Sequence, residues 1–451
     1  MELDAINRVY FVGIGGIGMS ALARYFVKRG CVVCGYDKTR TNLTIALEHE
    51  GILISYLDDE AALPVCFLED HEDTLIVYTP AIPKNSLILN YFKDAGFSLK
   101  KRSEVLGIIS RGQFCIAVAG THGKTTTSSM VAHILTHSGY GCTAFLGGIT
   151  TNYNSNFLIG DNNVVVVEAD EFDRSFLTLH PDIAVITSMD ADHLDIYGDA
   201  AQLHESFHLF AGQLKEGGTL YVKAGLPISN GVTYSLWERS DTYGSNIRVE
   251  QRSFVFDYFC QDHEIRDLHL QLPGKHNVEN AVAAISVALK LGISVEKIKD
   301  AIASFTGVKR RFEYIVNSAE HIYIDDYAHH PEELRACFDA VRQLYPDKKL
   351  TVIFQPHLFT RTRDFADGFA EVLGTVDELI LLEIYPAREL PIEGVNSALL
   401  LEKITLANKQ ICTKDEAVQK IKAERPELLV TVGAGDIDTL IQPLKVTLSH
   451  A

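Results

Sequence analysis

The stretch Val118-Ala119-Gly120-Thr121-His122-Gly123-Lys124-Thr125-Thr126-Thr127 decides the fold of the middle of this chain. An apolar run at 114–119 predicts a buried strand before the glycines, and residues 128–136 can form a helix after them. Strand, glycine turn, lysine, hydroxyl and helix together form a cradle for a nucleoside triphosphate, because the turn's backbone N–H groups point at phosphate oxygens. The general pattern has glycine where this chain has Val118, so the loop is a close variant of the Walker loop.

The loop residues have distinct expected roles. Lys124 is expected to bridge the β- and γ-phosphates, and the Thr125 hydroxyl is expected to bind Mg²⁺. The other residues expected to contact the nucleotide here are Gly120, Thr121, His122, Gly123 and Thr126. The alternative interpretation is a plain glycine turn between a strand and a helix.

Carboxylates follow the next two predicted strands. The valines at 164–167 lead into Glu168-Ala169-Asp170-Glu171, and a strand at 183–187 leads into an acidic stretch with His193. A carboxylate at the end of a strand beside a phosphate loop is where Mg²⁺ is usually held, and a second metal there can accept an imidazole. Glu168 and His193 are therefore candidate metal ligands with Thr125. A solvated strand end and a structural histidine are the alternatives.

Composition limits the class of protein. The chain has 451 residues, 47% hydrophobic and 22% charged, which is typical of a globular protein. This length predicts about two to four domains. The net charge of −18 disfavours nucleic acid or an anionic membrane as a partner. Anionic substrates must then be met by local positive sites.

The location is expected to be cytoplasmic. The N-terminus Met1-Glu2-Leu3-Asp4 is acidic, and no apolar signal core follows it. No run of about 18 apolar residues occurs, so no membrane span is expected. Cys31 and Cys34 form a C-x-x-C pair, but on a strand they would face opposite sides. A place in the core is therefore favoured over a redox or zinc role.

A second glycine loop lies near the N-terminus. A strand at 8–12 precedes Gly13-Ile14-Gly15-Gly16-Ile17-Gly18, a helix is expected at 19–29, and a strand at 31–35 leads to Asp37. This G-x-G-x-x-G pattern in isolation suggests a dinucleotide, and more generally a ligand with a diphosphate. The alternative is a glycine turn without a ligand.

Polar clusters also follow later strands. Asn277 and Asn280, at the start of a helix expected at 278–291, can read a base or merely cap the helix. Strands are expected at 322–325, 350–354, 378–384 and 428–432 with helices between them, which predicts a parallel sheet. Four clusters at these strand ends point to a ligand: residues 325–330; Gln355 and His357 with Arg361 and Arg363; Tyr385 with Arg388; and residues 433–436.

Taken together, these motifs resemble the Mur ligases of peptidoglycan synthesis over essentially the whole chain. The resemblance rests on residues 13–20, 119–127, 168–173, 190–195, 274–281, 310–312, 325–331 and 355–363. It implies an α/β protein of three domains: a Rossmann-like UDP-binding domain at 1–112, a central P-loop ATPase-like domain at 113–316, and a C-terminal Rossmann-like domain at 317–451 that closes over the site.

By this resemblance the first glycine loop holds the diphosphate of a UDP-sugar and not NAD. The residues implied for that site are Gly15, Gly16, Ile17, Gly18, Asp37, Thr79, Pro80 and Ala81. Within the family the chain is similar to the branch that adds L-alanine to UDP-N-acetylmuramate. Most Mur ligases that add later residues carry a carbamylated lysine on the helix after the His193 strand, but the corresponding residues 205–210 contain no lysine.

The implied reaction is ATP-dependent amide formation through an acyl phosphate, with Mg²⁺ as cofactor and Mn²⁺ as a possible substitute. The resemblance implies Lys124, Glu168, His193 and His357 as catalytic residues, and it adds Asn277, Asn280, Arg311 and Asp326 to the ATP site. It places L-alanine near Tyr327, His329, His357 and Arg361. The general base stays open between His357, Glu168 and bulk water, and the oligomeric state between monomer and homodimer.

Three other functions remain possible at this point. A related ligase attaches a recycled tripeptide to the same sugar nucleotide and shares most of these motifs. A nucleotide-sugar oxidoreductase would use the first glycine loop, but it would leave the phosphate loop unexplained. A non-catalytic ATP-binding module would not need ligand clusters in all three segments.

Overall fold

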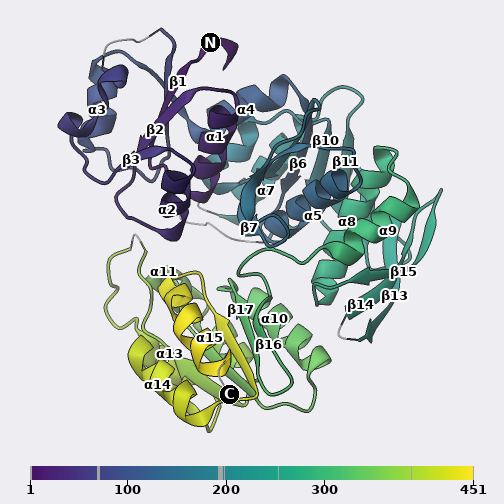
Figure 1. Cartoon of the computed structure of the whole chain (residues 1–451). Coiled ribbons are helices and arrows are strands. Elements are labelled where there is room, and N and C mark those ends of the chain that lie inside the picture. The colour runs from purple at the N-terminus through teal and green to yellow at the C-terminus, as the bar shows by residue number, and fades with distance from the viewer. Residues whose placement is uncertain are drawn as a thin grey trace. The chain divides into compact units, whose positions relative to one another are not determined.

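The computed structural model describes residues 3–68, 72–190, 197, 199–251, 253–387 and 389–449. Three sheets with helices between their strands are present in these residues, which confirms the α/β class (Figure 1). The chain divides into two compact units. The first unit comprises residues 1–246, 256–269 and 279–305, and the second comprises residues 247–255, 270–278 and 306–451.

The first sheet, in the first unit, has five parallel strands in the order β3-β2-β1-β4-β5. They are β1 (Arg8–Val12), β2 (Val32–Tyr36), β3 (Leu53–Ser55), β4 (Thr74–Tyr78) and β5 (Ser98–Lys101). The helices are α1 (Ile17–Lys28), α2 (Asn42–His49), α3 (Leu87–Asp94) and α4 (Arg102–Arg111), with short 3₁₀ turns at Leu3–Ala5, Glu60–Ala62 and Val65–Phe67. The strand order reverses at β1, which is where ligands bind in such sheets.

Helix α1 begins at Ile17, two residues earlier than expected. Gly16 is its N-cap, so the last glycine of the loop, Gly18, lies inside the first turn. The helix can start there because Gly18 has no side chain. A Cβ at this position would overlap the guanidinium of Arg102. The positive end of α1 therefore lies within the glycine loop itself.

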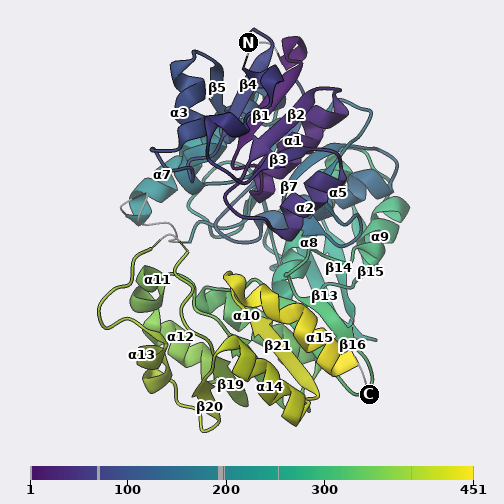
Figure 2. The same ribbon diagram turned by 60° about the vertical axis from the view of Figure 1, so that its left-hand side comes forward.

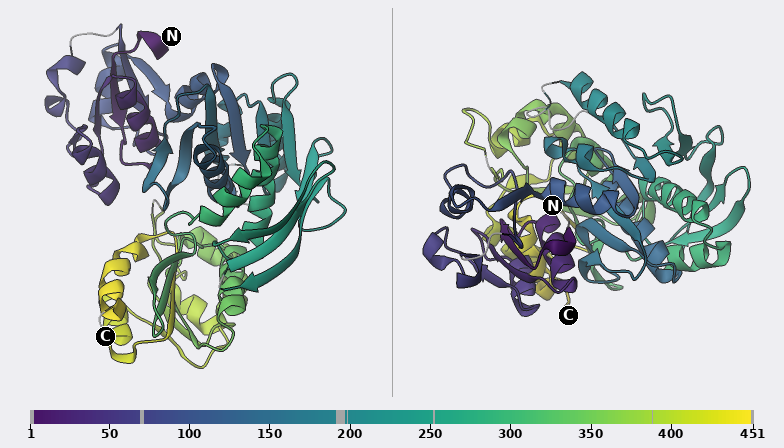
Figure 3. Two further views of the ribbon diagram at one scale, coloured as in Figure 1. Left: turned by 45° about the vertical axis from the view of Figure 1, so that its right-hand side comes forward. Right: turned by 90° about the horizontal axis from the view of Figure 1, so that it is seen from above.

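The second sheet has ten strands in the order β15-β14-β13-β12-β11-β10-β6-β9-β7-β8. Its members are β6 (Phe114–Ala119), β7 (Thr143–Thr150), β8 (Ser155–Leu158), β9 (Val164–Ala169), β10 (Ile183–Ile186), β11 (Thr219–Lys223), β12 (Val232–Ser235), β13 (Thr242–Glu250), β14 (Ser253–Phe259) and β15 (Glu264–Leu270). Strand β6 lies between β9 and β10, parallel to both. The last three strands form one edge (Figure 3).

The helices of this segment are α5 (Lys124–His137), α7 (Ala200–Gly212), α8 (Lys275–Lys290) and α9 (Val295–Ser304), with a 3₁₀ turn η4 (Phe172–Thr178). Helix α5 starts at Lys124, four residues before the expected helix, because Gly123 has a φ of +83° and turns the chain directly into it. Lys124, which was predicted to contact phosphates, is thus the first residue of α5.

The first unit has an apolar core that joins its two sheets. Tyr25 on α1 packs against Phe145 of β7, with ring centroids 5.5 Å apart. Polar contacts run alongside: Arg24 donates to the Asn156 side chain at 2.5 Å, and Asn156 donates to the carbonyl of Ile17 at 2.5 Å. The glycine loop is therefore held against the central sheet by both packing and hydrogen bonds.

The second unit contains a six-stranded sheet in the order β16-β17-β21-β18-β19-β20. The strands are β16 (Glu313–Asn317), β17 (Ile322–Asp326), β18 (Leu350–Phe354), β19 (Glu378–Leu381), β20 (Lys409–Ile411) and β21 (Leu428–Val432). The helices are α10 (Pro331–Leu344), α11 (Phe359–Asp364), α12 (Ala366–Leu373), α13 (Ser397–Lys403), α14 (Lys414–Glu424) and α15 (Ile441–Ser449), with a 3₁₀ turn at Asp436–Leu440. Helices α14 and α15 share one apolar core with the sheet (Figure 2).

The prediction of a parallel sheet here is correct for β17 to β21, whereas β16 runs antiparallel to β17. Strand β19 ends at Leu381, so the prediction of a strand to residue 384 was too long. The neighbouring strand β18 ends before Pro356, which has no N–H to donate. The Leu382 carbonyl instead accepts from the Ser397 hydroxyl at 2.8 Å.

Helix α5 is fixed to the rest of the first unit through the buried His133. Its Nε2 lies 3.0 Å from the Ala301 carbonyl, and its Nδ1 lies 2.9 Å from the Tyr153 hydroxyl. Burial, and next the nearby His137, lower the pKa of His133 to about 4. The folded protein therefore keeps this imidazole neutral, whereas the unfolded chain takes up a proton below about pH 6.5.

We expect His133→Gln to reduce the acid sensitivity of folding. The neutral form of His133 does not reduce the stability of the folded protein at pH values above the histidine pKa of the unfolded chain, about 6.5. As pH falls from there toward 4, the unfolded chain takes up a proton that the folded protein does not, so the folded protein loses stability. The unfolding free energy of the unsubstituted protein should thus fall by about 2 kcal/mol more than that of the variant between pH 7 and pH 5. Urea unfolding at the two pH values measures this, with His49→Gln at the surface as control. Equal pH dependence in all three proteins would contradict the prediction.

Candidate functional site

The phosphate loop joins β6 to α5 and is held by the end of β10. Gly120 has a φ of +137°, and a Cβ there would overlap the hydroxyl of Thr187. That hydroxyl donates to the Ala119 carbonyl at 3.0 Å, and the backbone N–H of His122 donates to the Ser188 hydroxyl at 2.6 Å. The shape of the loop is thus fixed by two hydroxyl residues that sequence reasoning missed, although Thr187 ends a predicted strand and Ser188 directly follows it.

Lys124 forms a buried ion pair. Its Nζ lies 2.8 Å from the carboxylate of Glu171 and 2.6 Å from the Gly120 carbonyl. Burial alone would lower the pKa of Lys124, but Glu171 first, then Asp170 and Glu168, outweigh it and raise that pKa above its usual value. The lysine is therefore a stable cation facing the loop. Sequence reasoning did not assign its partner Glu171.

Glu168 lies at the end of β9, where its backbone pairs in parallel register with Val118. Its carboxylate accepts a hydrogen bond from the backbone N–H of Gly147 at 3.0 Å. This close approach is possible because residue 147 is glycine, since a Cβ at this position would overlap the carboxylate. Thr125 is buried in the first turn of α5. His193 lies outside the described residues.

Within the part of the chain that the structure describes, no three His, Cys, Asp or Glu side chains gather in a way that could hold a metal ion. A magnesium ion beside phosphates needs few protein ligands, because it usually keeps phosphate and water oxygens. The hydroxyl of Thr125 and the carboxylate of Glu168 are oxygen donors of the kind that Mg²⁺ prefers. The donor set is thus chemically suited to magnesium.

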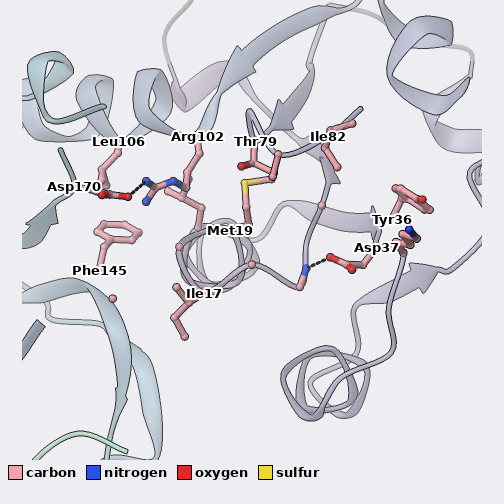
Figure 4. A pocket seen from close by; sticks show the side chains of 18 of the residues that line it. Ile17, Met19, Tyr36, Asp37, Thr79, Ile82, Arg102, Leu106, Phe145 and Asp170 are labelled. Atoms are coloured by element: carbon pink, nitrogen blue, oxygen red, sulfur yellow. Dashed lines mark hydrogen bonds and ion pairs between the residues drawn. The ribbon is translucent and has the colours of Figure 1, made fainter. Parts of the chain in front are cut away.

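The first glycine loop and the acidic end of β9 line the same cavity, of about 650 Å³ (Figure 4). Of the residues expected at the UDP-sugar site, those on its wall are Gly15, Gly16, Ile17, Gly18, Asp37, Thr79 and Ala81. Pro80 is not on the wall and is exposed. Glu168 and Asp170 line the wall formed by the central sheet.

Asp37 is tied to the glycine loop. Its carboxylate accepts from the backbone N–H of Gly15 at 2.7 Å and from that of Thr39 at 3.1 Å. An acid in this position is usually available to a ribose hydroxyl in a dinucleotide site. In this chain its hydrogen bond to Gly15 fixes the conformation of the loop. The residues of the wall that sequence reasoning missed include Arg102, Phe145 and Gly147.

The two asparagines at the start of α8 have different surroundings. Asn277 is buried and donates its amide to the Pro273 carbonyl at 2.6 Å, which favours the alternative of a residue that secures the helix start. Asn280 lies beside the phosphate loop: a Cβ at Gly123 would be 2.8 Å from its Oδ1. A role for either in binding ATP stays a prediction.

Asp326 organises the start of the second unit's site. Its carboxylate accepts from the backbone N–H groups of Phe312 and Ala328, each at 2.7 Å. Burial raises the pKa of Asp326 to about 6, although Arg311 acts in the opposite direction. The guanidinium of Arg311 also lies over the Tyr327 ring, 5.4 Å from its centroid.

The four residues expected at the amino acid site lie together at the ends of β17 and β18. The His329 ring is 5.7 Å from the His357 ring and 5.2 Å from the Tyr327 ring. An Arg361 N–H points at Nδ1 of His357 across a long 3.5 Å contact. Burial lowers the pKa of His329 to about 4, so it is neutral at neutral pH. The ring of Tyr385 stacks on His357 at 5.9 Å, and Arg388 lies outside the described residues.

Comparison with known families accounts for nearly all of this chain. Residues 8–114 match the catalytic domain of the Mur ligase family, residues 118–288 match the Mur ligase middle domain, and residues 310–435 match the Mur ligase, glutamate ligase domain. A Flavobacterium psychrophilum protein is 51% identical over 450 residues, covering 100% of both chains. The chain belongs to the Mur ligase family.

The similar Mur ligases have consistent names. The Flavobacterium psychrophilum protein is a UDP-N-acetylmuramate–L-alanine ligase, as is one from Christiangramia forsetii that is 50% identical over 100% of this chain and 99% of that protein. The solved UDP-N-acetylmuramate-alanine ligase of Thermotoga maritima matches with a TM-score of 0.83 at 27% identity, covering 97% of this chain and 98% of that one.

A solved murein peptide ligase of Psychrobacter arcticus has the same fold, with a TM-score of 0.71 at 24% identity, covering 98% of this chain and 99% of that one. The match to Mur ligases in all three segments confirms the three-domain architecture that the sequence predicts. Both glycine loops lie within matched segments, residues 13–18 in the first and residues 120–123 in the middle one. No helix of the described residues is long and apolar enough to cross a membrane.

Proposed function

We propose that this chain joins L-alanine to the lactyl carboxylate of UDP-N-acetylmuramate, with cleavage of ATP to ADP and phosphate. The observation that carries the proposal is the cavity of about 650 Å³ in the first unit. A diphosphate loop forms one wall and the acidic end of β9, beside the phosphate loop, forms the other. Full-length relatives with that activity in their names support the choice of substrates.

The first step activates the carboxylate. A carboxylate oxygen attacks the γ-phosphorus, and the bond between the γ-phosphorus and the oxygen that bridges to the β-phosphorus breaks. The products of this step are an acyl phosphate and ADP. Two anions must approach each other, so the protein's contribution is positioning and charge neutralisation. Lys124 supplies the positive charge, and the backbone N–H groups of Gly123 and of the first turn of α5 supply hydrogen bonds. Thr125 and Glu168 would hold Mg²⁺, which supplies further neutralisation when it is bound.

The second step forms the amide. The neutral amine of L-alanine attacks the acyl carbon, the amine loses a proton, and inorganic phosphate leaves. We propose that the second unit's cluster holds the amino acid: Arg361 pairs with its carboxylate, while Tyr327, His329 and His357 surround it. His357 is a candidate to accept the amine proton; Glu168 and bulk water are the others.

We further propose ATP contacts at Asn277, Asn280, Arg311 and Asp326, domain boundaries near residues 112 and 316, and a cytoplasmic location. The acidic net charge of −18 suits a small-molecule enzyme without a nucleic-acid partner. The oligomeric state, monomer or homodimer, stays a prediction, and so does the use of Mn²⁺ in place of Mg²⁺.

Phosphate release tests the proposed function. The protein is incubated with ATP, Mg²⁺ and UDP-N-acetylmuramate, with L-alanine, with the recycled tripeptide, or with neither. Release that needs both the sugar nucleotide and L-alanine is the expected result. Release with the tripeptide in place of L-alanine would indicate the recycling ligase. No release from a folded protein that binds ATP would indicate a non-catalytic module.

We expect Glu168→Gln to raise the Mg²⁺ concentration needed for half-maximal activity by about tenfold or more, because an amide oxygen binds a hard cation less strongly than a carboxylate. Gln keeps an oxygen that can accept from the backbone N–H of Gly147, so the local fold should persist. Magnesium titration of the initial rate measures the effect. An unchanged magnesium dependence would remove Glu168 from the metal site.

A further inference from the structure

Arg102 lies where the two walls of the cavity meet. It is the first residue of α4, and this helix is fixed to the turn η4: the Thr178 hydroxyl donates to the Ser103 carbonyl at 2.7 Å. A Cβ at Gly107 would overlap the Thr178 carbonyl, so the helix and the turn are in close contact. The backbone of Arg102 is therefore held in place by the central segment of the first unit.

The guanidinium of Arg102 contacts both walls. Its Nη2 lies 3.4 Å from Oδ2 of Asp170, and its Nη1 occupies the space that a Cβ at Gly18 would need. Figure 4 shows Arg102 and Asp170 pointing toward each other above the ring of Phe145. The side chain is 22% exposed, so it is partly shielded from water but open to the cavity.

The charge of the cavity wall makes this arginine important for an anionic ligand. Among the described residues that line the cavity, the acids are Asp37, Asp58, Glu168 and Asp170, and the cations are Lys38 and Arg102. Lys38 is exposed, whereas Arg102 is largely shielded from water. A sugar nucleotide brings two negative phosphates and a carboxylate, so it needs a cation beyond the glycine loop's N–H groups.

We infer that Arg102 binds an anionic group of the sugar nucleotide, either its diphosphate or its lactyl carboxylate, while Asp170 positions the guanidinium. The inference rests on the proposed function. A guanidinium has five N–H donors, and the 3.4 Å contact with Asp170 involves one nitrogen, so the others can take a second oxyanion.

Asp170 is suited to this positioning role. Its second oxygen, Oδ1, accepts from the backbone N–H of Phe172 at 3.1 Å, which fixes the orientation of the carboxylate. The negative charge of Asp170 also helps to raise the pKa of Lys124 in the phosphate loop. A ligand bound to Arg102 is therefore connected, through Asp170, to Lys124 of the phosphate loop. Arg102 links the sugar nucleotide to the acidic end of β9.

Calorimetric binding of UDP and of UDP-N-acetylmuramate, without ATP, tests this inference. Arg102→Lys keeps the positive charge but loses the planar guanidinium, which can donate two parallel hydrogen bonds to one oxyanion. The substitution should weaken binding by about ten- to a hundredfold. Equal loss for both ligands identifies the diphosphate as the bound group, and loss for UDP-N-acetylmuramate alone identifies the carboxylate. Arg111→Lys, exposed at the other end of α4, is the matched control and should bind like the unsubstituted protein.

The positioning role has its own test in Asp170→Asn and the double variant. If Asp170 holds the guanidinium, Arg102→Lys should cost several-fold less affinity in the Asp170→Asn background than alone; additive losses would overturn that role. Unchanged affinity of Arg102→Lys for both ligands would overturn the whole inference. Circular dichroism monitors folding, and Arg102→Gln replaces the lysine variant if that one does not fold. Failure of the unsubstituted protein to bind UDP-N-acetylmuramate would instead refute the proposed function.

Discussion

Lys124→Ala should abolish product formation, with a loss in rate of at least about a thousandfold, because the lysine supplies the charge that lets a carboxylate approach the γ-phosphate. Its ammonium group is already held inside the loop, 2.6 Å from the Gly120 carbonyl. Removing it leaves the backbone N–H groups as the loop's remaining phosphate contacts. Release of phosphate in the presence of both substrates measures the effect.

A folding control is needed for this variant, because alanine leaves the buried carboxylate of Glu171 without the lysine. Breaking such a pair costs about 3–5 kcal/mol of stability. The double variant Lys124→Ala/Glu171→Gln removes the lone charge, so it should unfold at a higher temperature than the single variant and remain inactive. A folded Lys124→Ala protein that still forms ADP at the normal rate would contradict the mechanism.

Arg361→Lys should raise the KM for L-alanine by about ten- to a hundredfold, with little change in the KM values for ATP and the sugar nucleotide. A planar guanidinium pairs with a carboxylate through two parallel hydrogen bonds, which a lysine cannot reproduce. Arg361 is buried beside His357, so the geometry of this pairing is constrained. Initial rates at varied L-alanine concentrations measure the change.

The same helix provides a matched control. Arg363 is also in α11, but it is half exposed and pairs with its neighbour Asp364 at 2.7 Å. Arg363→Lys should leave all three KM values within about twofold, because a surface pair contributes little. A similar rise in the KM for L-alanine in both variants would show that α11 tolerates no change. An unchanged KM in Arg361→Lys would remove this residue from the amino acid site.

Fewer than half of the described strands were predicted from the sequence; each of these is a short apolar run followed by glycine or polar residues. The strands at 8–12, 114–119, 350–354 and 428–432 have their expected bounds. Helix starts were less accurate: α1 and α5 begin at Ile17 and Lys124, inside the glycine loops. Because glycine has a low helix propensity, both helices were predicted to begin after the glycine loops. A glycine at the start of a helix, however, lowers its stability only slightly.

The candidate site was predicted in part. Tyr327, His329, His357 and Arg361 are in one cluster because each follows the end of a parallel strand, and such ends meet at one edge of a sheet. The same rule brings Glu168 to the end of β9 beside the phosphate loop's strand. The resemblance implied Pro80 at the sugar site together with its neighbours Thr79 and Ala81, but Pro80 is exposed and does not line the cavity.

The sequence by itself determined the chemistry of each loop, since the left-handed turn of Gly120 and Gly123, and the lysine after it, are local properties of consecutive residues. Only the tertiary structure decided which groups meet across the chain. Lys124 pairs with Glu171 and Arg102 with Asp170, over sequence separations of 47 and 68 residues. Such pairs depend on how the sheets and helices pack, and that packing is set by the sum of many apolar contacts rather than by any motif.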